Sequence, residues 1–331
     1  MKLYLIAIIC LAVAPLAAQE TAQPSPIYDP AKGEPGARHA DISDDGKLVV
    51  FSLWGDLWRW DAEDGATTQL TMHEAYDSYP RLSPDGGTIA FSSDRDGNYN
   101  VYLLDIRGGV PRQLTWNSAG DYLAGWSGDG EWVYFTSTRN SEHALWRIPA
   151  KGGTEELVLD DRFIPGDVSI RDGNIAYCSG AVRRYRRDYK GSANEDVYLL
   201  RNGHELPDQL TEFKGNDRWV QLLPDGGLLF TREIDRHFQF MLKDGPREQA
   251  RKLSSFDDIG AEEVSVSRNG EWLVFQRMQY LYRASVGALV SGELNSELVK
   301  LEIKQDYRGP QTEERTFTSG MENPHLADNG K

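Results

Sequence analysis

Residues 82–116 read LSPDGGTIAFSSDRDGNYNVYLLDIRGGVPRQLTW, and this stretch carries the pattern that decides the fold. A turn ending in glycine leads into an apolar strand with an aromatic residue. A polar turn follows, and then a second aromatic strand and a Leu-Thr pair. Aspartate before glycine is typical of tight turns, because glycine tolerates positive φ angles. The stretch therefore predicts a small unit of antiparallel strands.

The same pattern recurs along the chain. Its turn glycines stand at positions 46, 86, 130, 173, 226 and 270, and an aromatic residue follows each glycine by four or five positions. Repeats of about 40–50 residues with several strands each are typical of β-propellers. No segment has the sustained 3.6-residue apolar period of a helix. The sequence predicts an all-β fold, a six-bladed β-propeller of four-stranded antiparallel blades over residues 38–303, with aromatic rings between the blades.

The N-terminus has the pattern of a secretory signal. Met1 and Lys2 precede an apolar run over residues 3–16, and Ala17 and Ala18 provide a cleavage site, so residues 1–18 are predicted to be a signal peptide. The run is shorter than the roughly 20 residues of a membrane span. Residues 19–37 are rich in Pro and Gly and predict an extended lead-in. Residues 37–41 could supply an outer or an inner strand to the sixth blade.

The charge of the chain limits its possible binding partners, and its cysteine content limits its possible disulfides. The chain has 51 acidic and 36 basic residues, a net charge of -15. This balance argues against binding to nucleic acid or to an anionic membrane, which needs clustered cations. Removal of the signal peptide takes away Cys10 and leaves Cys178, which we expect to be a small buried residue without a disulfide.

The sequence contains no recognisable motif for catalysis, metal binding or phosphate binding. The string nearest to a nucleophile elbow, GWSGD at 125–129, falls on a blade turn, and DRDGN at 94–98 places its glycine two positions too early for a calcium loop. The six histidines, at 39, 73, 143, 204, 237 and 325, have no zinc-site spacing. No phosphate-binding loop is present. We predict no catalytic residue, no cofactor and no metal site in this chain.

One basic loop is the candidate binding site. Between positions 183 and 190 there are five cations and one acid, in a chain that is otherwise acidic. We hypothesise that this loop docks on an acidic surface of following domains or holds a peptide carboxylate through Arg forks. The alternative is a solvated loop whose Arg stems cover aromatic rings. The candidate residues are Arg183, Arg184, Tyr185, Arg186, Arg187, Tyr189 and Lys190.

The repeat resembles that of known propeller families. The string at 82–116 resembles the SPDG-type repeat of TolB-like proteins, tricorn-type proteases and prolyl-oligopeptidase relatives. The segment 183–198 resembles the Lys/Arg-Arg-Tyr-Arg-Gly-Gly…Asp-Ile-Trp segment of tricorn proteases, with Asp188 inserted and Ser192 in place of a second Gly. After a polar linker over 304–323, residues 324–331 begin a further unit. This order resembles the passage from the first to the second propeller of a tricorn-like protein.

This resemblance implies a function for a longer chain. A tricorn-like serine peptidase would continue with a second propeller and a PDZ-bearing catalytic portion, and the family forms hexamers. The propeller would gate or channel peptides and contact the downstream domains. No catalytic residue of the family maps onto this chain, so the fragment alone is expected to be inactive. The family prototype is cytoplasmic, whereas the predicted signal indicates export, most consistent with the periplasm. Two alternatives stay open: a TolB-like periplasmic protein-binding propeller, and the propeller of a prolyl-oligopeptidase-type peptidase.

Overall fold

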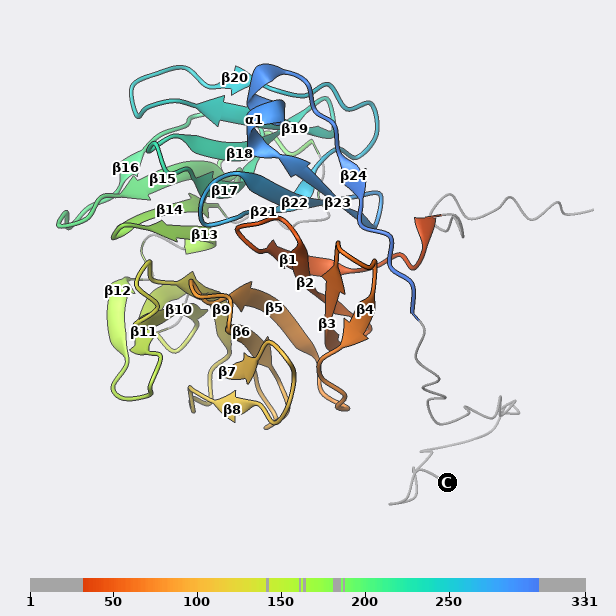
Figure 1. Ribbon diagram of the computed structural model, residues 1–331. Helices are drawn as coiled ribbons and strands as arrows, with labels where there is room; N and C mark the ends of the chain where they lie inside the picture. Colours follow the sequence, from red (N-terminus) through yellow and green to blue (C-terminus); the bar gives the residue numbers. More distant parts are fainter. Residues whose placement is uncertain are drawn as a thin grey trace, which may run out of the picture.

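The computed structural model describes residues 32–303 except 141, 142, 161, 163, 164, 181–185 and 187. Within them, 24 strands form six four-stranded antiparallel sheets, and the order of strands in each sheet follows the chain. The sheets are arranged as blades around a common axis (Figure 1). The first strands of neighbouring blades lie against one another and are therefore innermost. The predicted six-bladed propeller is confirmed.

Blades 1 to 3 occupy the first half of the described chain. Their strands, from the innermost outwards, are β1 (Arg38–Ile42), β2 (Leu48–Leu53), β3 (Asp56–Asp61) and β4 (Thr67–Gln69); β5 (Asp77–Leu82), β6 (Thr88–Ser93), β7 (Asn100–Asp105) and β8 (Arg112–Gln113); and β9 (Asp121–Trp126), β10 (Trp132–Ser137), β11 (Ala144–Pro149) and β12 (Glu156–Leu159).

Blades 4 to 6 repeat this order. Their strands are β13 (Pro165–Arg171), β14 (Asn174–Ser179), β15 (Asp196–Leu200) and β16 (Asp208–Gln209); β17 (Asp217–Leu222), β18 (Leu228–Ile234), β19 (His237–Lys243) and β20 (Arg251–Lys252); and β21 (Glu262–Val266), β22 (Trp272–Arg277), β23 (Tyr280–Ser285) and β24 (Glu297–Leu298). A short helix, α1 (Val286–Ser291), precedes β24; Ser285 caps its N-terminus and Gly292 ends it at a φ of 84°.

The Ser-x-Asp-Gly turns join the first two strands of a blade. In blade 2 the Ser83 hydroxyl donates to Asp85 and accepts from the Thr88 N–H, while Asp85 accepts from the Gly87 N–H. Gly86 adopts a φ of 69°, in the region that favours glycine. Equivalent bonds occur in blades 1, 3 and 6, so the motif fixes the hairpin through its own side chains.

The Leu-Thr pair secures the outer part of a blade. In blade 2 the Thr115 hydroxyl accepts from the Val101 N–H and contacts Asn100 at the start of β7, and Leu114 is buried. Blades 1, 4 and 5 use Thr71, Thr211 and Ser254 in the same way. The hydroxyl thus satisfies a buried N–H group that would otherwise lack a partner.

The core is divided into six hydrophobic clusters, each joining two neighbouring blades. Each cluster contains one of the aromatic residues that follow the turn glycines, and each of these rings is fully buried. They are Phe51, Phe91, Phe135, Tyr177, Phe230 and Phe275. The expectation that these rings fill the wedges between blades is confirmed, because a flat sheet buries both faces only against its neighbours.

The ring closes without exchange of a strand. Both β1 and β21 are innermost strands of complete blades, so residues 37–41 add no strand to blade 6. Instead Gly33 forms a parallel bridge with Leu301 beyond β24, and the Gly36 N–H donates to the Gln279 carbonyl. The lead-in therefore lies along the outer strands of blade 6. Figure 1 shows the two ends of the described chain meeting there.

Candidate functional site

Two cavities lie back to back along the propeller axis. One has a volume of about 580 Å³ and the other about 460 Å³, and the innermost strands of all six blades line both. The cavities share four lining residues: Arg81, Ala124, Val168 and Gln221. They therefore adjoin at this level, and we call the two cavities together the central channel, with one mouth on each side of the propeller. We call the larger one the turn-side cavity, because its rim includes the Ser-x-Asp-Gly turns, and the smaller one the link-side cavity, because it lies where the innermost strands begin.

A layer of polar side chains lines the channel where the cavities meet. The Asp41 carboxylate accepts from the Ser265 hydroxyl at 2.6 Å and from the Leu82 N–H at 2.8 Å. In the same layer the Leu222 N–H donates to the Ser169 hydroxyl, and the Val266 N–H donates to Gln221. Each of these bonds joins one blade to the next. The sequence therefore uses the inner layer to hold the ring together as well as to line the channel.

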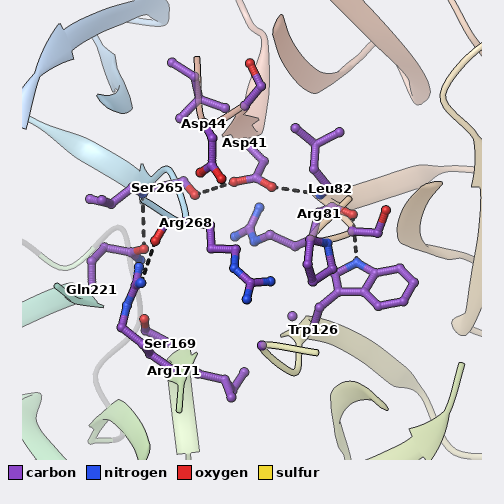
Figure 2. Close-up of a pocket in the computed structure, with 18 of the residues that line it drawn as sticks. Asp41, Asp44, Arg81, Leu82, Trp126, Ser169, Arg171, Gln221, Ser265 and Arg268 are labelled. Atoms are coloured by element: carbon purple, nitrogen blue, oxygen red, sulfur yellow. Dashed lines mark hydrogen bonds between the residues drawn. The ribbon is translucent and has the colours of Figure 1, made fainter. Parts of the chain in front are cut away.

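Three arginines line the turn-side cavity: Arg81, Arg171 and Arg268. Figure 2 shows Arg81 and Arg268 pointing into the middle of the cavity. Arg81 donates to the backbone carbonyls of His39 and Pro80, and Arg171 donates to those of Leu222 and Arg268. Burial lowers the pKa of Arg171, and the positive charge of Arg268 acts in the same direction.

Five aspartates line the same cavity, and the carboxylates of four of them accept hydrogen bonds from neighbouring residues. Asp41 is held as described, and Asp44 accepts from the Asn269 N–H at 2.7 Å. Asp45 and Asp85 accept the bonds of their own turns, which lower the pKa of both carboxyls. The fifth, Asp172, stands in the turn of blade 4 with a φ of 51°. The mouth is thus of mixed charge, with arginines towards the axis.

The link-side cavity is lined by residues in a strained backbone conformation. His39, Tyr79, Trp219 and Glu263 have φ angles of 54°, 53°, 49° and 50°, which non-glycine residues seldom adopt. Each lies at a β-bulge near the start of an innermost strand. A bulge re-aims side chains, and such strain of roughly 1–3 kcal/mol per residue is concentrated at functional sites.

Aromatic and acidic groups meet in the link-side cavity. The rings of His39 and Tyr79 stack with centroids 3.9 Å apart, and His39 Nε2 lies 3.8 Å from Glu263 Oε1. The His39 N–H also donates to Glu263 at 2.8 Å. Across the opening, the Tyr122 ring lies near His143, with centroids 6.2 Å apart. This mouth therefore differs from the arginine-lined one in both charge and aromatic content.

The predicted basic loop leaves the blade at the link-side mouth. Its flanks, Gly180 and Glu195, both line the link-side cavity. Arg186 is exposed and its guanidinium lies 4.5 Å from the Tyr189 ring centroid, while Lys190 pairs with Asp188 at 3.1 Å. The remaining candidates, Arg183, Arg184, Tyr185 and Arg187, lie outside the described residues. The stacking of Arg186 on Tyr189 is a contact that the solvated-loop alternative also predicts.

Exposed apolar side chains gather at the same end of the propeller. Among the described residues, five of the eight exposed large hydrophobic side chains lie in the turn after β2 or in connections between blades: Trp54, Met72, Tyr76, Trp116 and Ile259. We call these five the apolar face. Because β24 is antiparallel to β23, it also runs towards this end. Residue 303 therefore leaves the propeller on the link side.

The other sequence candidates belong to the framework of the blades. Ser127 and Asp129 form the turn of blade 3, and residues 94–99 connect β6 to β7. Cys178 is buried, and burial raises the pKa of its thiol, so it is an unreactive core residue. Within the described ranges, no group of three or more His, Cys, Asp or Glu could hold a metal ion, and no helix has the length and apolarity to cross a membrane.

No repeated motif in the sequence marks the channel residues. Arg81 and Arg171 stand among the last two residues of an innermost strand, and Arg268 stands in the turn that follows one. Their distance along the chain from the turn glycines is the sequence feature that could have identified them. The strained residues of the link side have no comparable signal, because a bulge is set by the partner strand.

Comparisons with known proteins agree with this architecture. The family model described as the tricorn protease N-terminal beta propeller domain matches residues 37–288. The chain is 34% identical over 63 residues to tricorn protease homolog 1 of Streptomyces coelicolor, which covers 19% of this chain and 6% of that protein. It is 32% identical over 83 residues to the uncharacterized peptidase YuxL of Bacillus subtilis, covering 25% and 13% respectively.

Solved structures share the fold at low identity. The crystal structure of the tricorn protease matches with a TM-score of 0.67 at 18% identity, over 82% of this chain and 27% of that one. A putative TolB from Agrobacterium tumefaciens matches with a TM-score of 0.56 at 20% identity, over 66% and 81%. The chain thus spans 27% of the tricorn protease and at most 13% of the curated relatives named above.

Proposed function

The chain belongs to the family of tricorn protease N-terminal β-propeller domains, and from this premise we propose that it is the propeller portion of an exported, tricorn-like serine peptidase. In this proposal the propeller passes peptides through its channel and docks the domains that follow it, and those domains cleave the substrate. The assembly is a homo-oligomer, a hexamer by family resemblance.

The observation that carries this proposal is the channel itself. The two cavities adjoin along the axis, and their combined lining includes apolar and polar residues from every blade. In this proposal an extended peptide passes along the two cavities, whereas a folded protein does not. Concave sites of a few hundred Å³ with a small number of placed polar groups are typical of specific binding sites.

Three features support docking on the link side. The apolar face is exposed there, the chain leaves the propeller towards that end, and the basic loop begins and ends at that mouth. Exposed apolar residues on one face of a protein commonly mark a surface that another protein covers. The basic loop supplies the cations that would meet an acidic surface of the downstream domains.

The peptidase proposal is tested by comparing two proteins. The longer protein that contains this chain is expected to hydrolyse a fluorogenic oligopeptide, and the 331-residue chain is expected to show no turnover. A serine-directed phosphonate should abolish the activity of the longer protein. A longer protein that binds partner proteins but cleaves no peptide would contradict the proposal and favour the TolB-like alternative.

The docking role of the basic loop is tested in the longer protein. The double variant Arg184→Ala/Arg187→Ala is expected to weaken assembly and to lower peptide turnover. The matched control is Lys47→Ala/Arg107→Ala, which removes two cations from side chains that are at least half exposed and pair within blades 1 and 2. Unchanged sedimentation and turnover in the loop variant would contradict the docking role.

The proposed export has its own test. Cleavage after Ala18 predicts a mature protein that begins at Gln19. Mass spectrometry of the protein from a periplasmic extract of its source organism measures that terminus. An intact N-terminus in a cytoplasmic fraction would contradict export.

A further inference from the structure

We propose that the turn-side mouth of the channel recognises a peptide carboxylate, through the guanidinium groups of Arg81 and Arg268 with Arg171 beside them. This inference rests on the proposed passage of peptides and adds a substrate preference to it. The residues concerned are distinct from the basic loop, whose flanks Gly180 and Glu195 line the other cavity.

The channel arginines differ from the other arginines near the blade cores. Arg95, Arg139 and Arg232 each donate to a fully buried aspartate of their own blade at 2.7–3.0 Å. Within the described part of the chain, neither Arg81 nor Arg268 has a carboxylate within ion-pair distance, and the bonds that Arg81 makes go to carbonyl oxygens. Their charge is therefore available to a ligand.

The arrangement of charge favours an anion at the axis. Arg81 and Arg268 point into the same cavity. Burial lowers the pKa of Arg171, the charge of Asp172 opposes this shift, and the charge of Arg268 adds to it. A bound carboxylate would offset this repulsion, and guanidinium groups match a carboxylate with two parallel hydrogen bonds. Because the lining also holds five aspartates, a ligand with a single negative charge is favoured over a polyanion.

The rest of the wall suits a peptide. One residue after the polar layer, the innermost strand of each blade has an apolar side chain. All six line the turn-side cavity: Ile42, Leu82, Trp126, Ile170, Leu222 and Val266. An aliphatic side chain next to the carboxylate would contact this ring and lose water-exposed apolar surface. The ligand class is thus a peptide with a hydrophobic residue beside a carboxylate, either its C-terminus or an acidic side chain.

The experiment measures binding to the full 331-residue chain by fluorescence anisotropy. The probe is the pentapeptide Ala-Ala-Ala-Ala-Leu with a neutral coumarin label on its N-terminus, prepared with a free C-terminal carboxylate and as the C-terminal amide. We expect the acid to bind at least tenfold more tightly than the amide. A third probe, Ala-Ala-Glu-Ala-Leu amide, distinguishes the two sources: tight binding of this amide assigns the site to acidic side chains, and weak binding assigns it to the terminus.

The variants Arg268→Met and Arg81→Met keep the apolar stem of the side chain and remove the charge. Each is expected to weaken binding of the acid at least fivefold and to bring it closer to the amide. Arg107→Met is the matched control, because this exposed arginine pairs with Asp105 outside the channel. If Arg81→Met lowers the melting temperature, the test relies on peptide binding by Arg268→Met alone, because Arg268 is exposed.

The outcomes separate this inference from the proposed function. Equal affinity of the acid and both amides, or unchanged affinity in Arg268→Met, would overturn carboxylate recognition and leave peptide passage standing. Absence of binding by every probe would overturn the recognition as well. Passage itself is judged separately, by peptide turnover of the longer protein.

Discussion

At the scale of single residues, buried arginine–aspartate pairs brace the blades. In blade 3, Arg139 donates to both oxygens of Asp121 at 2.8 and 2.9 Å, and its guanidinium lies 4.8 Å from the Trp146 ring centroid. Asp121 is completely buried. Blades 2 and 5 repeat this arrangement with Arg95 and Arg232. Each pair fixes the start of an innermost strand and so shapes the link-side mouth.

Removal of one partner should be costly. The variant Arg139→Met leaves the Asp121 charge buried without its guanidinium, and loss of one partner from a buried pair costs about 3–5 kcal/mol. We expect a loss of this size in the free energy of unfolding, measured by urea denaturation. Arg107→Met, which breaks an exposed pair, should change it by less than about 1 kcal/mol. Equal unfolding midpoints for the two variants would contradict the bracing role.

Residue roles could be predicted from the sequence where a motif repeats. The aromatic after each turn glycine is expected in the wedge between blades and lies there, because every blade meets the same packing requirement. Arg81 and Arg268 have no such repetition. The equivalents of Arg81 in the other blades are Asp41, Gly125, Ser169, Gln221 and Ser265, so the side chain at this inner position differs between repeats. Arg268 lies in the turn that follows this position.

At the scale of the elements, the turn glycines have two separate roles. Gly46 and Gly86 have nearly the same φ, 70° and 69°, but their surroundings differ. A Cβ atom on Gly46 would overlap the Trp272 ring in blade 6, whereas one on Gly86 would meet no atom within 4 Å. The first turn therefore takes part in closing the ring, and the second is under conformational constraint alone.

This difference gives a matched pair of variants. Gly86→Ala should cost about 1–2 kcal/mol, the penalty for an L-residue in the left-handed region. Gly46→Ala should cost an additional ~1–3 kcal/mol because it overpacks the junction of blades 1 and 6. Thermal unfolding of both variants measures the difference. The same melting temperature for the two would show that the Trp272 contact contributes nothing to closure.

The start of a third strand carries a partly buried acid in blade 1 and an amide in blade 2. Asp56 accepts from Gln69 and from the His73 N–H, and burial raises the pKa of its carboxyl. Blade 2 has Asn100 at the equivalent place, which accepts from the Asn117 N–H. The hydrogen bonds at this position can thus be made by a carboxyl group or by an amide.

The raised pKa predicts a pH dependence. A carboxyl with a folded-state pKa above its unfolded value contributes stability that is present at low pH and is lost as the pH rises through the folded pKa. Asp56→Asn should therefore gain stability relative to the wild type at pH 7, and the gain should disappear below pH ~4, near the pKa of an unfolded aspartate. Urea denaturation at pH 3.5 and pH 7 measures it. A gain that is larger at pH 3.5 would contradict the assignment.

Elements were predictable to the extent that local chemistry fixes them. The turns and the paired strands follow from Asp-Gly and from the apolar runs, and they lie where the pattern places them. The bulges at His39, Tyr79, Trp219 and Glu263 could not be predicted. A left-handed conformation at a bulky residue opposes its own preference and is imposed by the register with the second strand.

At the scale of the whole molecule, the ring closes by contact and not by a shared strand. Asp41 bonds to Ser265, Asp44 to Asn269, and Arg283 to the Gly46 carbonyl, so blades 1 and 6 meet through side chains at the turn side. The mode of ring closure could not be predicted from the sequence. The first strand has the same sequence pattern whether it belongs to blade 1 or is added to blade 6. The channel that results is the feature on which the proposed function depends.

The most direct measurement blocks this channel after the protein has folded. Val168 lines both cavities, whereas Val110 is 93% exposed and lies outside them, and the buried Cys178 is unreactive. Val168→Cys and Val110→Cys are made in the longer protein and modified with a bulky maleimide. We predict that modified Val168→Cys loses most of its turnover of an oligopeptide, while its unmodified form and modified Val110→Cys retain theirs. Full turnover by a completely modified Val168→Cys would contradict the passage of peptides through this propeller.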